Sequence, residues 1–226
     1  PEGSKNSKGR AIQNLINIEQ DDKVKAFICT QDLKDEDYVN GNYVIMATKM
    51  GQVKKTSLEQ YSRPRSNGIN AITVKDGDEL LEAKLTNGNS QIMLAVKSGK
   101  AIRFEENKTR PMGRNASGVR GIRLKDNKDE VVGMISVNDM DANILVVSEN
   151  GYGKRSSLED YRLTNRGGKG VKTISITEKT GKLVTLKSVS DNDDLMIINK
   201  SGIAIRMQVE DLRVMGRATQ GVKVIS

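Results

Sequence analysis

Short apolar runs alternate along this chain with glycine turns and short basic runs. In the first example, residues 43–47 are apolar, Gly51 marks a turn, and residues 53–55 carry two lysines. Two β-rich runs that meet at a glycine predict a tight hairpin, because glycine adopts the positive φ that such turns require. The same unit occurs four times, with turns at Gly51, Gly99, Gly151 and Gly202.

A basic loop follows each predicted hairpin and ends in a second glycine. These loop glycines are Gly9, Gly68, Gly118, Gly170 and Gly221. A further strand is predicted after the later four glycines, over residues 69–74, 119–124, 171–176 and 222–225. Another strand, as at residues 80–85 and 131–137, leads into the next hairpin. Each module therefore contains about four predicted strands, which is typical of a propeller blade.

The spacing between equivalent glycines is close to constant. It is 48, 52 and 51 residues for the turn glycines and 59, 50, 52 and 51 residues for the loop glycines. A period near 50 indicates an array of similar modules, so we expect one all-β domain over residues 1–226. Its modules are predicted near residues 9–68, 68–118, 118–170 and 170–221. No hairpin precedes Gly9, so either neighbouring modules exchange strands or part of a first module lies upstream in a longer protein.

The charge and the missing residue types narrow the chemistry. The net charge is +8, with 37 Lys and Arg against 29 Asp and Glu, which fits a polyanionic partner. The chain has no histidine, the commonest general base and metal ligand, and Gly168-Lys169 is followed by glycine rather than by the Ser or Thr of a phosphate-binding loop. We therefore expect no catalytic residue, no metal site and no cofactor in this chain.

Two further features bear on the partner and on the cellular setting. The chain has no tryptophan and only two phenylalanines, so it has few aromatic surfaces on which unpaired bases could stack, and duplex is the more natural target. No apolar stretch approaches the ~20 residues needed to cross a bilayer. The single cysteine, Cys29, lies in an apolar run, which predicts a buried strand thiol in a reducing, cytoplasmic setting.

The basic loops contain the main candidate contacts to phosphate. Arginine presents a planar, permanently charged donor group, and flanking glycines let main-chain amides approach the same oxygens. The candidates in the loops are Arg63, Arg65, Arg110, Arg114, Arg162, Arg166, Lys169, Arg213 and Arg217. Weaker candidates lie on the second strand of each hairpin, since the outward face of a strand is often simply charged; they are Lys54, Lys55, Arg103, Lys154, Arg155 and Arg206.

One arginine of each loop is predicted to occupy the same phase of the repeat. These are Arg63, Arg114, Arg166 and Arg217. Because similar modules place equivalent residues on one surface, we expect these four side chains on one continuous outer rim.

Three segments carry a resemblance to a known family. Residues 118–124, 150–155 and 215–222 closely resemble the C-terminal domain of bacterial DNA gyrase A, and the resemblance covers essentially the whole chain. It implies a β-pinwheel, a propeller-like disc of six four-stranded blades that exchange strands with their neighbours. Its basic rim binds and wraps duplex DNA. The chain would then be a fragment of such a domain, with its first blade truncated upstream.

The same resemblance implies the wider setting. The chain would be part of an ATP-hydrolysing type IIA topoisomerase whose cleaving tyrosine and ATPase lie elsewhere. Its partners would be duplex DNA, the rest of gyrase A, and gyrase B, in an A2B2 holoenzyme in the bacterial cytoplasm, at the nucleoid. No membrane partner is expected, and the isolated chain should be a monomer. The alternatives are the equivalent C-terminal domain of topoisomerase IV and a propeller that serves as a protein-interaction platform.

One loop resembles the signature of that family, a Gln-Arg-Arg-Gly-Gly-Lys-Gly box in the first blade that gives gyrase its chiral wrapping. The residues are Asn165, Arg166, Gly167, Gly168, Lys169 and Gly170. Asn165 stands where the box has arginine, and the loop belongs to a later module. We interpret it as a degenerate copy and expect the box itself upstream of this chain.

Overall fold

All four predicted hairpins are present in the computed structural model, which describes residues 22–225 and, before them, residues 6, 8, 9, 11, 14, 16 and 18. Their turns lie at glycines with φ between +74° and +85°. The hairpins are β1 (Tyr43–Thr48) with β2 (Gln52–Ser57), β4 (Gln91–Val96) with β5 (Lys100–Glu105), β8 (Asn143–Ser148) with β9 (Tyr152–Ser157), and β12 (Asp194–Ile198) with β13 (Ala204–Gln208). Of the residues that follow the first loop glycine, Gly9, positions 10, 12 and 13 lie outside the described residues.

Two more strands complete each of the first three sheets. On one side, the first hairpin strand pairs with the inner strand that follows its hairpin along the chain; these are β3 (Leu80–Thr86), β7 (Val131–Val137) and β11 (Leu183–Val189). On the other side, the second hairpin strand pairs with an outer strand; these are β6 (Val119–Arg120), β10 (Val171–Lys172) and β14 (Val222–Lys223). The sheet orders are β3-β1-β2-β6, β7-β4-β5-β10 and β11-β8-β9-β14.

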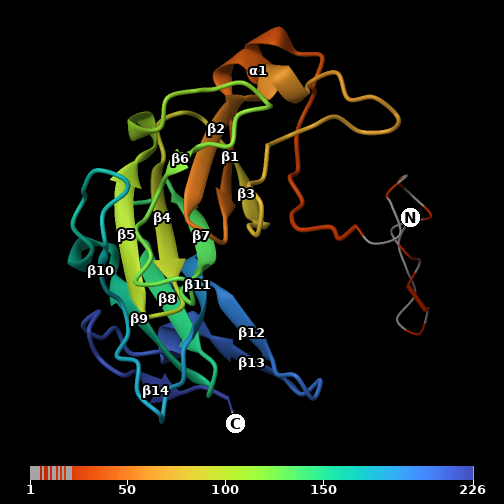
Figure 1. Cartoon of the computed structure of the whole chain (residues 1–226). Helices are drawn as coiled ribbons and strands as arrows, with labels where there is room; N and C mark the ends of the chain where they lie inside the picture. Colours follow the sequence, from red (N-terminus) through yellow and green to blue (C-terminus); the bar gives the residue numbers. More distant parts are fainter. Residues whose placement is uncertain are drawn as a thin grey trace.

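The outer strand of each sheet comes from the following module. β6 follows the hairpin β4–β5 along the chain, yet it pairs with β2 in the preceding sheet, through Val119 with Val53 and Arg120 with Gln52. Neighbouring modules therefore exchange strands, which the sequence left open. Figure 1 shows the blades following one another from β1–β2 in orange to β12–β13 in blue.

Short helices follow the hairpins. Each hairpin leads directly into a 3-10 helix; these are η2 (Leu58–Tyr61), η3 (Glu106–Lys108), η4 (Leu158–Asp160) and η5 (Val209–Asp211). Helix α1 (Glu36–Gly41) precedes β1, and its N-terminus is capped by Asp35, whose side chain accepts hydrogen bonds from the amides of Asp37 and Tyr38. The basic loops begin at the ends of the 3-10 helices.

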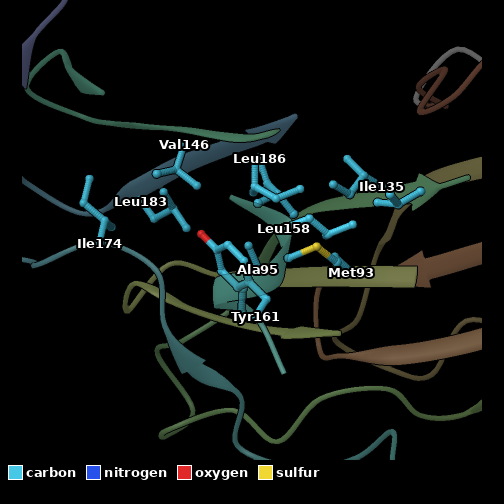
Figure 2. Close-up of a cluster of buried hydrophobic side chains, with 12 residues drawn as sticks. Met93, Ala95, Ile135, Val146, Leu158, Tyr161, Ile174, Leu183 and Leu186 are labelled. Carbon is cyan, nitrogen blue, oxygen red and sulfur yellow. The ribbon is translucent and has the colours of Figure 1, made fainter. Parts of the chain in front are cut away.

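The hydrophobic core lies between neighbouring blades. Because side chains alternate between the two faces of a strand, β4 packs Ile92 and Leu94 against the blade of β1, and Met93 and Ala95 against the blade of β8. Figure 2 shows the second of these layers, where Met93 and Ala95 lie near Tyr161. Burial on both faces explains why β1, β4 and β8 have nearly continuous apolar sequences; β12, in the last hairpin, leaves Met196 and Ile198 exposed.

Three local predictions were wrong. Residues 69–74 form no strand, because the described residues contain no earlier hairpin for them to pair with; instead Thr73 donates from Oγ1 to the carbonyl oxygen of Asn115 at 2.7 Å. The outer strands are two residues long, because the chain then bends toward the hairpin turn, where the Gly121 amide donates to the Gly51 carbonyl at 2.8 Å. Cys29 is exposed and lies outside any strand.

Candidate nucleic-acid interface

Three of the loop glycines bring their arginine loops against the preceding blade, whereas Gly68 has open space around it. At Gly118, Gly170 and Gly221 the φ angles are +89°, +68° and +81°, and an added Cβ would lie 2.5 to 2.6 Å from a carbonyl oxygen of the neighbouring hairpin. Only glycine combines this conformation with so close an approach. These three glycines are therefore the points where one module docks on the last.

The side chain of one arginine strengthens each of these junctions. Nη1 of Arg114 donates to the carbonyl oxygen of Asn70 at 3.0 Å, and Nη1 of Arg166 donates to that of Arg120 at 3.0 Å. Nη1 of Arg217 makes the equivalent bond to Lys172 at 2.9 Å. In each case the acceptor is the second residue after the previous loop glycine.

Arg63 does not share this arrangement. The first loop, counted from the start of its 3-10 helix to Gly68, is two residues shorter than the other three, so Arg63 is not in phase with Arg114. Arg63 and Arg65 are exposed and line, together with Arg114, a hollow of about 660 Å³. The predicted common phase holds for three loops and is wrong for the first.

The other candidates in the loops are on the surface. They are exposed, and they are Arg110, Arg162, Lys169 and Arg213. In the loop that resembles the wrapping box, Arg166 and Gly167 are half-buried, whereas Asn165, Gly168 and Lys169 are exposed. The amide of Gly167 donates to the Gly121 carbonyl at 2.6 Å, so this loop rests on the chain that continues from β6.

Three further cations were missed by the sequence reasoning. Arg120, Lys172 and Lys223 are the last residues of the outer strands β6, β10 and β14, and all three are exposed. Their signal in the sequence is a cation two positions after a loop glycine. Because the outer strand is the edge of each sheet, these three cations lie at equivalent positions on the edges of successive blades.

The candidates on the hairpin strands do not lie on that surface, which corrects the sequence-based placement. Lys54 and Lys154 are fully buried. Nζ of Lys54 donates to the carbonyl oxygens of Arg114, at 2.7 Å, and Ala71, and Nζ of Lys154 donates to that of Gly216 at 2.6 Å. Burial lowers the pKa of each of these lysines from 10.5 to about 8. These two lysines therefore hold the loop of the next module through hydrogen bonds to its main chain.

The cation next along each strand joins neighbouring blades. Nζ of Lys55 lies 3.0 Å from Oε1 of Glu106, the first residue of η3, and both side chains are buried. Nη1 of Arg103 donates to the carbonyl oxygens of Leu158, at 2.9 Å, and Tyr161, at 3.0 Å, in the next module. The carbonyl groups of Leu158 in η4 and of Tyr161, which follows η4, thus obtain a cationic donor from the preceding blade, whereas Lys55 is paired with the side-chain carboxylate of η3.

The last two strand candidates differ from one another. Arg155 is buried, donates to the carbonyl oxygens of Leu212 and of Glu210, and forms an ion pair with Asp191. Arg206 is exposed on β13 and forms an ion pair with Asp194. Of the six strand candidates, only Arg206 is placed to meet a macromolecule in solution.

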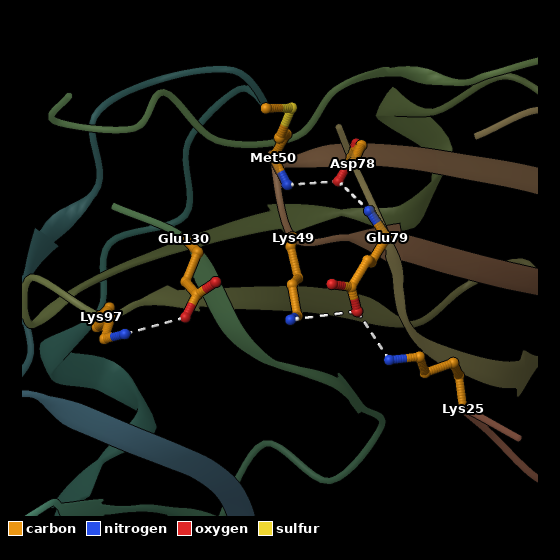
Figure 3. A network of polar contacts seen from close by, with 7 residues as sticks. All are labelled: Lys25, Lys49, Met50, Asp78, Glu79, Lys97 and Glu130. Carbon is orange, nitrogen blue, oxygen red and sulfur yellow. Dashed lines mark hydrogen bonds and ion pairs between the residues drawn. The ribbon is translucent and has the colours of Figure 1, made fainter. Parts of the chain in front are cut away.

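One group of acidic side chains lies at the turn ends of the hairpins, in addition to the acidic residues in the first turn of each 3-10 helix. Asp78 accepts from the amide of Met50 beside the first turn at 2.9 Å, and Glu79 forms ion pairs with Lys25 and Lys49 (Figure 3). In the next module, Asp129 accepts from the amide and the hydroxyl of Ser98, at 2.9 and 2.7 Å. These acids therefore accept hydrogen bonds from the amides of the turns and form ion pairs with lysines near them.

The alternation of hairpins and loops also matches a known family. The chain matches the family described as "DNA gyrase C-terminal domain, beta-propeller" over residues 1–31, 42–87, 91–138, 142–190 and 193–226. The chain belongs to this family. DNA gyrase A of Staphylococcus aureus (strain NCTC 8325 / PS 47) is 44% identical to it over 227 residues, and that of Staphylococcus epidermidis is 43% identical over 226 residues. These matches cover 100% of this chain and 25% of each relative, so the chain spans about a quarter of the length of these curated relatives.

Solved structures agree with this membership. The C-terminal domain of DNA topoisomerase IV superimposes with a TM-score of 0.87 at 25% identity, covering 96% of this chain and 66% of that one. The DNA gyrase A C-terminal domain superimposes with a TM-score of 0.85, also at 25% identity, covering 97% and 71%. The family resemblance and the all-β pinwheel class drawn from the sequence are confirmed.

Among the described residues, no helix is long and apolar enough to cross a membrane. The same residues contain no group of three or more His, Cys, Asp or Glu side chains arranged to hold a metal ion.

Proposed function

We propose that this chain binds and bends duplex DNA along the edge formed by its outer strands and basic loops. The observation that carries this proposal is the exposed cation at the same position of three successive outer strands, at Arg120, Lys172 and Lys223. Phosphates also repeat regularly along a duplex, so a regular row of cations matches the backbone rather than the bases. Membership of the gyrase C-terminal domain family supports the same partner.

Recognition should be independent of base order. Within the described part of the chain, the helices have at most six residues, and none is long enough to lie along a major groove and read base edges. We therefore expect the affinity to depend on the length and the deformability of the duplex.

The test is duplex binding measured by electrophoretic mobility and fluorescence anisotropy, with duplexes of increasing length and at several salt concentrations. If the edge neutralises about six to eight phosphates, log affinity should fall with log salt with a slope of roughly −5 to −7, at about −0.9 per phosphate. Replacing Arg120, Lys172 and Lys223 by alanine together should flatten the slope by roughly 2.7 units.

The matched control removes three exposed lysines that lie outside the outer strands and the basic loops, Lys75, Lys128 and Lys182. This control has the same net charge as the edge variant, so a smaller change in slope shows that position matters and not charge alone. A strong preference for one short site, at fixed length and salt, would contradict the proposal. Salt-insensitive binding to an acidic protein would instead favour an interaction platform.

The chain covers only part of its relatives, so its place in a larger enzyme is also a proposal. We infer that it is the DNA-binding part of gyrase A, in a type IIA topoisomerase where gyrase A pairs with gyrase B as A2B2 in the bacterial cytoplasm, at the nucleoid. Cleavage and ATP hydrolysis would then lie in the remainder of the enzyme. The chain alone should be a monomer, and sedimentation equilibrium at micromolar concentration tests this: a dimer mass would contradict it.

The loop of residues 165–170 bears on wrapping. Its Arg166 is held by main-chain carbonyl groups, and Lys169 is exposed, but Asn165 supplies no charge where the box has arginine. We infer that the chain bends DNA without efficient chiral wrapping. Linking-number change on relaxed circular DNA, with topoisomerase I added, measures this directly. A large positive writhe captured by the chain would refute the inference.

A further inference from the structure

The three loop arginines that sit at the module junctions differ from the other cations of the edge. Arg114, Arg166 and Arg217 are half-buried, and each donates from Nη1, at 2.9 to 3.0 Å, to the main-chain oxygen of the second residue after the previous loop glycine. Arg166 donates a second bond, from Nε to the carbonyl oxygen of Lys108 at 2.9 Å. Each of these guanidinium groups therefore directs at least one donor at the protein.

The repeat provides an internal comparison of residue types. The junction position is arginine in all three copies, at 114, 166 and 217, although lysine would carry the same charge. The position that supplies the carbonyl oxygen is Asn70, Arg120 or Lys172. Its side chain varies because only its backbone is used, whereas the junction needs the fixed planar donor geometry of arginine.

The junction bonds fix the distance between one loop and the outer strand beside it. The bond from Arg166 ends on the carbonyl of Arg120, and the bond from Arg217 ends on that of Lys172. The acceptor residues are themselves the exposed cations at the ends of β6 and β10. Each of these two junction arginines therefore holds an exposed cation of the neighbouring blade in place through its peptide group.

We propose that Arg166 and Arg217 are positioning residues, which set the spacing of the cations that meet the DNA, and that their own charge is secondary; Arg114 makes the equivalent bond at the first junction, to Asn70. This inference rests on the proposed DNA binding and deepens it. It assigns the phosphate contacts to exposed cations, chiefly Arg120, Lys172 and Lys223.

The experiment replaces arginine by lysine, which keeps the charge and removes the planar donor group. One variant carries Arg114→Lys, Arg166→Lys and Arg217→Lys together, and a second carries Arg166→Lys alone, in case the triple variant does not fold. The matched control is Arg123→Lys, at an exposed arginine outside the junctions. Amide hydrogen exchange without DNA and duplex binding at fixed salt are measured for each protein.

Without DNA, Arg166→Lys should accelerate exchange at the amides of Thr164 and Gly167, which donate to the preceding blade at 2.9 and 2.6 Å. With DNA, Arg166→Lys should weaken binding severalfold and the triple variant at least tenfold, since each lost hydrogen bond corresponds to about a fivefold change. The control should show neither change.

Unchanged exchange in Arg166→Lys would overturn the positioning role. Faster exchange with wild-type affinity would also overturn it, because the spacing would then not matter for binding. If the parent chain itself shows no salt-dependent affinity for duplex, the proposed function fails, and the exchange data still report separately whether the junction arginines hold the loops.

Discussion

The buried ion pair between Lys55 and Glu106 makes a sharp test of how the blades are joined. The first residue of each 3-10 helix is buried, and it is leucine in η2 and η4, valine in η5 and glutamate only in η3. The blade before η3 supplies lysine, whereas the blades before η4 and η5 supply Arg103 and Arg155. A guanidinium reaches the helix carbonyls by itself; a lysine, with a compact ammonium, is instead paired with a carboxylate.

We therefore predict that Glu106→Leu is strongly destabilising, although leucine is the natural residue at the equivalent position of η4. The change leaves the Lys55 ammonium buried without its partner, which costs about 3–5 kcal/mol. It also removes the acceptor of Thr86 Oγ1, at 2.6 Å, and of the Ser90 amide, at 3.1 Å, each worth about 1 kcal/mol. Burial of the leucine returns about 2 kcal/mol. The net loss is about 4 kcal/mol.

For a domain of this size, that loss corresponds to a fall in Tm of roughly 8–16 °C, measured by far-ultraviolet circular dichroism. The double variant Lys55→Arg with Glu106→Leu copies the arginine–leucine junction that Arg103 makes with Leu158. It should recover at least half of the loss, with the remainder due to Thr86 and Ser90.

Two results would refute this reasoning. If Glu106→Leu lowers the stability by less than about 1 kcal/mol, the pair does not join the blades. If the double variant is as unstable as Glu106→Leu, an arginine–leucine pair cannot replace the lysine–glutamate pair at this junction. Lys55→Arg alone completes the double-mutant cycle and gives the coupling energy directly.

Two further outcomes follow from the docking of the loops. Gly118→Ala should destabilise the chain by about 2 kcal/mol or more in thermal melts, because the φ of Gly118 is +89° and the new Cβ would lie 2.6 Å from the Val53 carbonyl oxygen. Gly113→Ala, which has open space around the new Cβ, should be nearly neutral in the same thermal melts. Stability should rise from pH 8 to pH 10, because the pKa values of Lys54 and Lys154 are about 8 when folded and 10.5 when unfolded, so the unfolded chain binds more protons in this window. A double methionine variant at both lysines should lose this rise, and an equal rise in the variant would contradict the assignment.

The sequence by itself determined the repeating unit and the fold class. The turn at Gly51 and the alternation of β-rich runs depend on local backbone preferences, which the residues in each run carry themselves. The loop glycines and the arginines beside them could also be predicted from the sequence, because they recur at equivalent positions in successive copies of the repeat. The cations at 120, 172 and 223 had the same periodic signal and could have been found.

Only the tertiary structure decided which cations are exposed. Lys54 and Lys154 lie on strands whose charge is typical of a solvent face, yet they are buried because the loop of the next module covers them, 60 and 62 residues further along the chain. Because neighbouring modules exchange their outer strands, the loop of the next module lies over these two lysines. No local sequence pattern encodes this arrangement. Whether a lysine meets solvent or a main-chain carbonyl is therefore set by the neighbouring module, since burial is a property of the packed array and not of the strand that carries the charge.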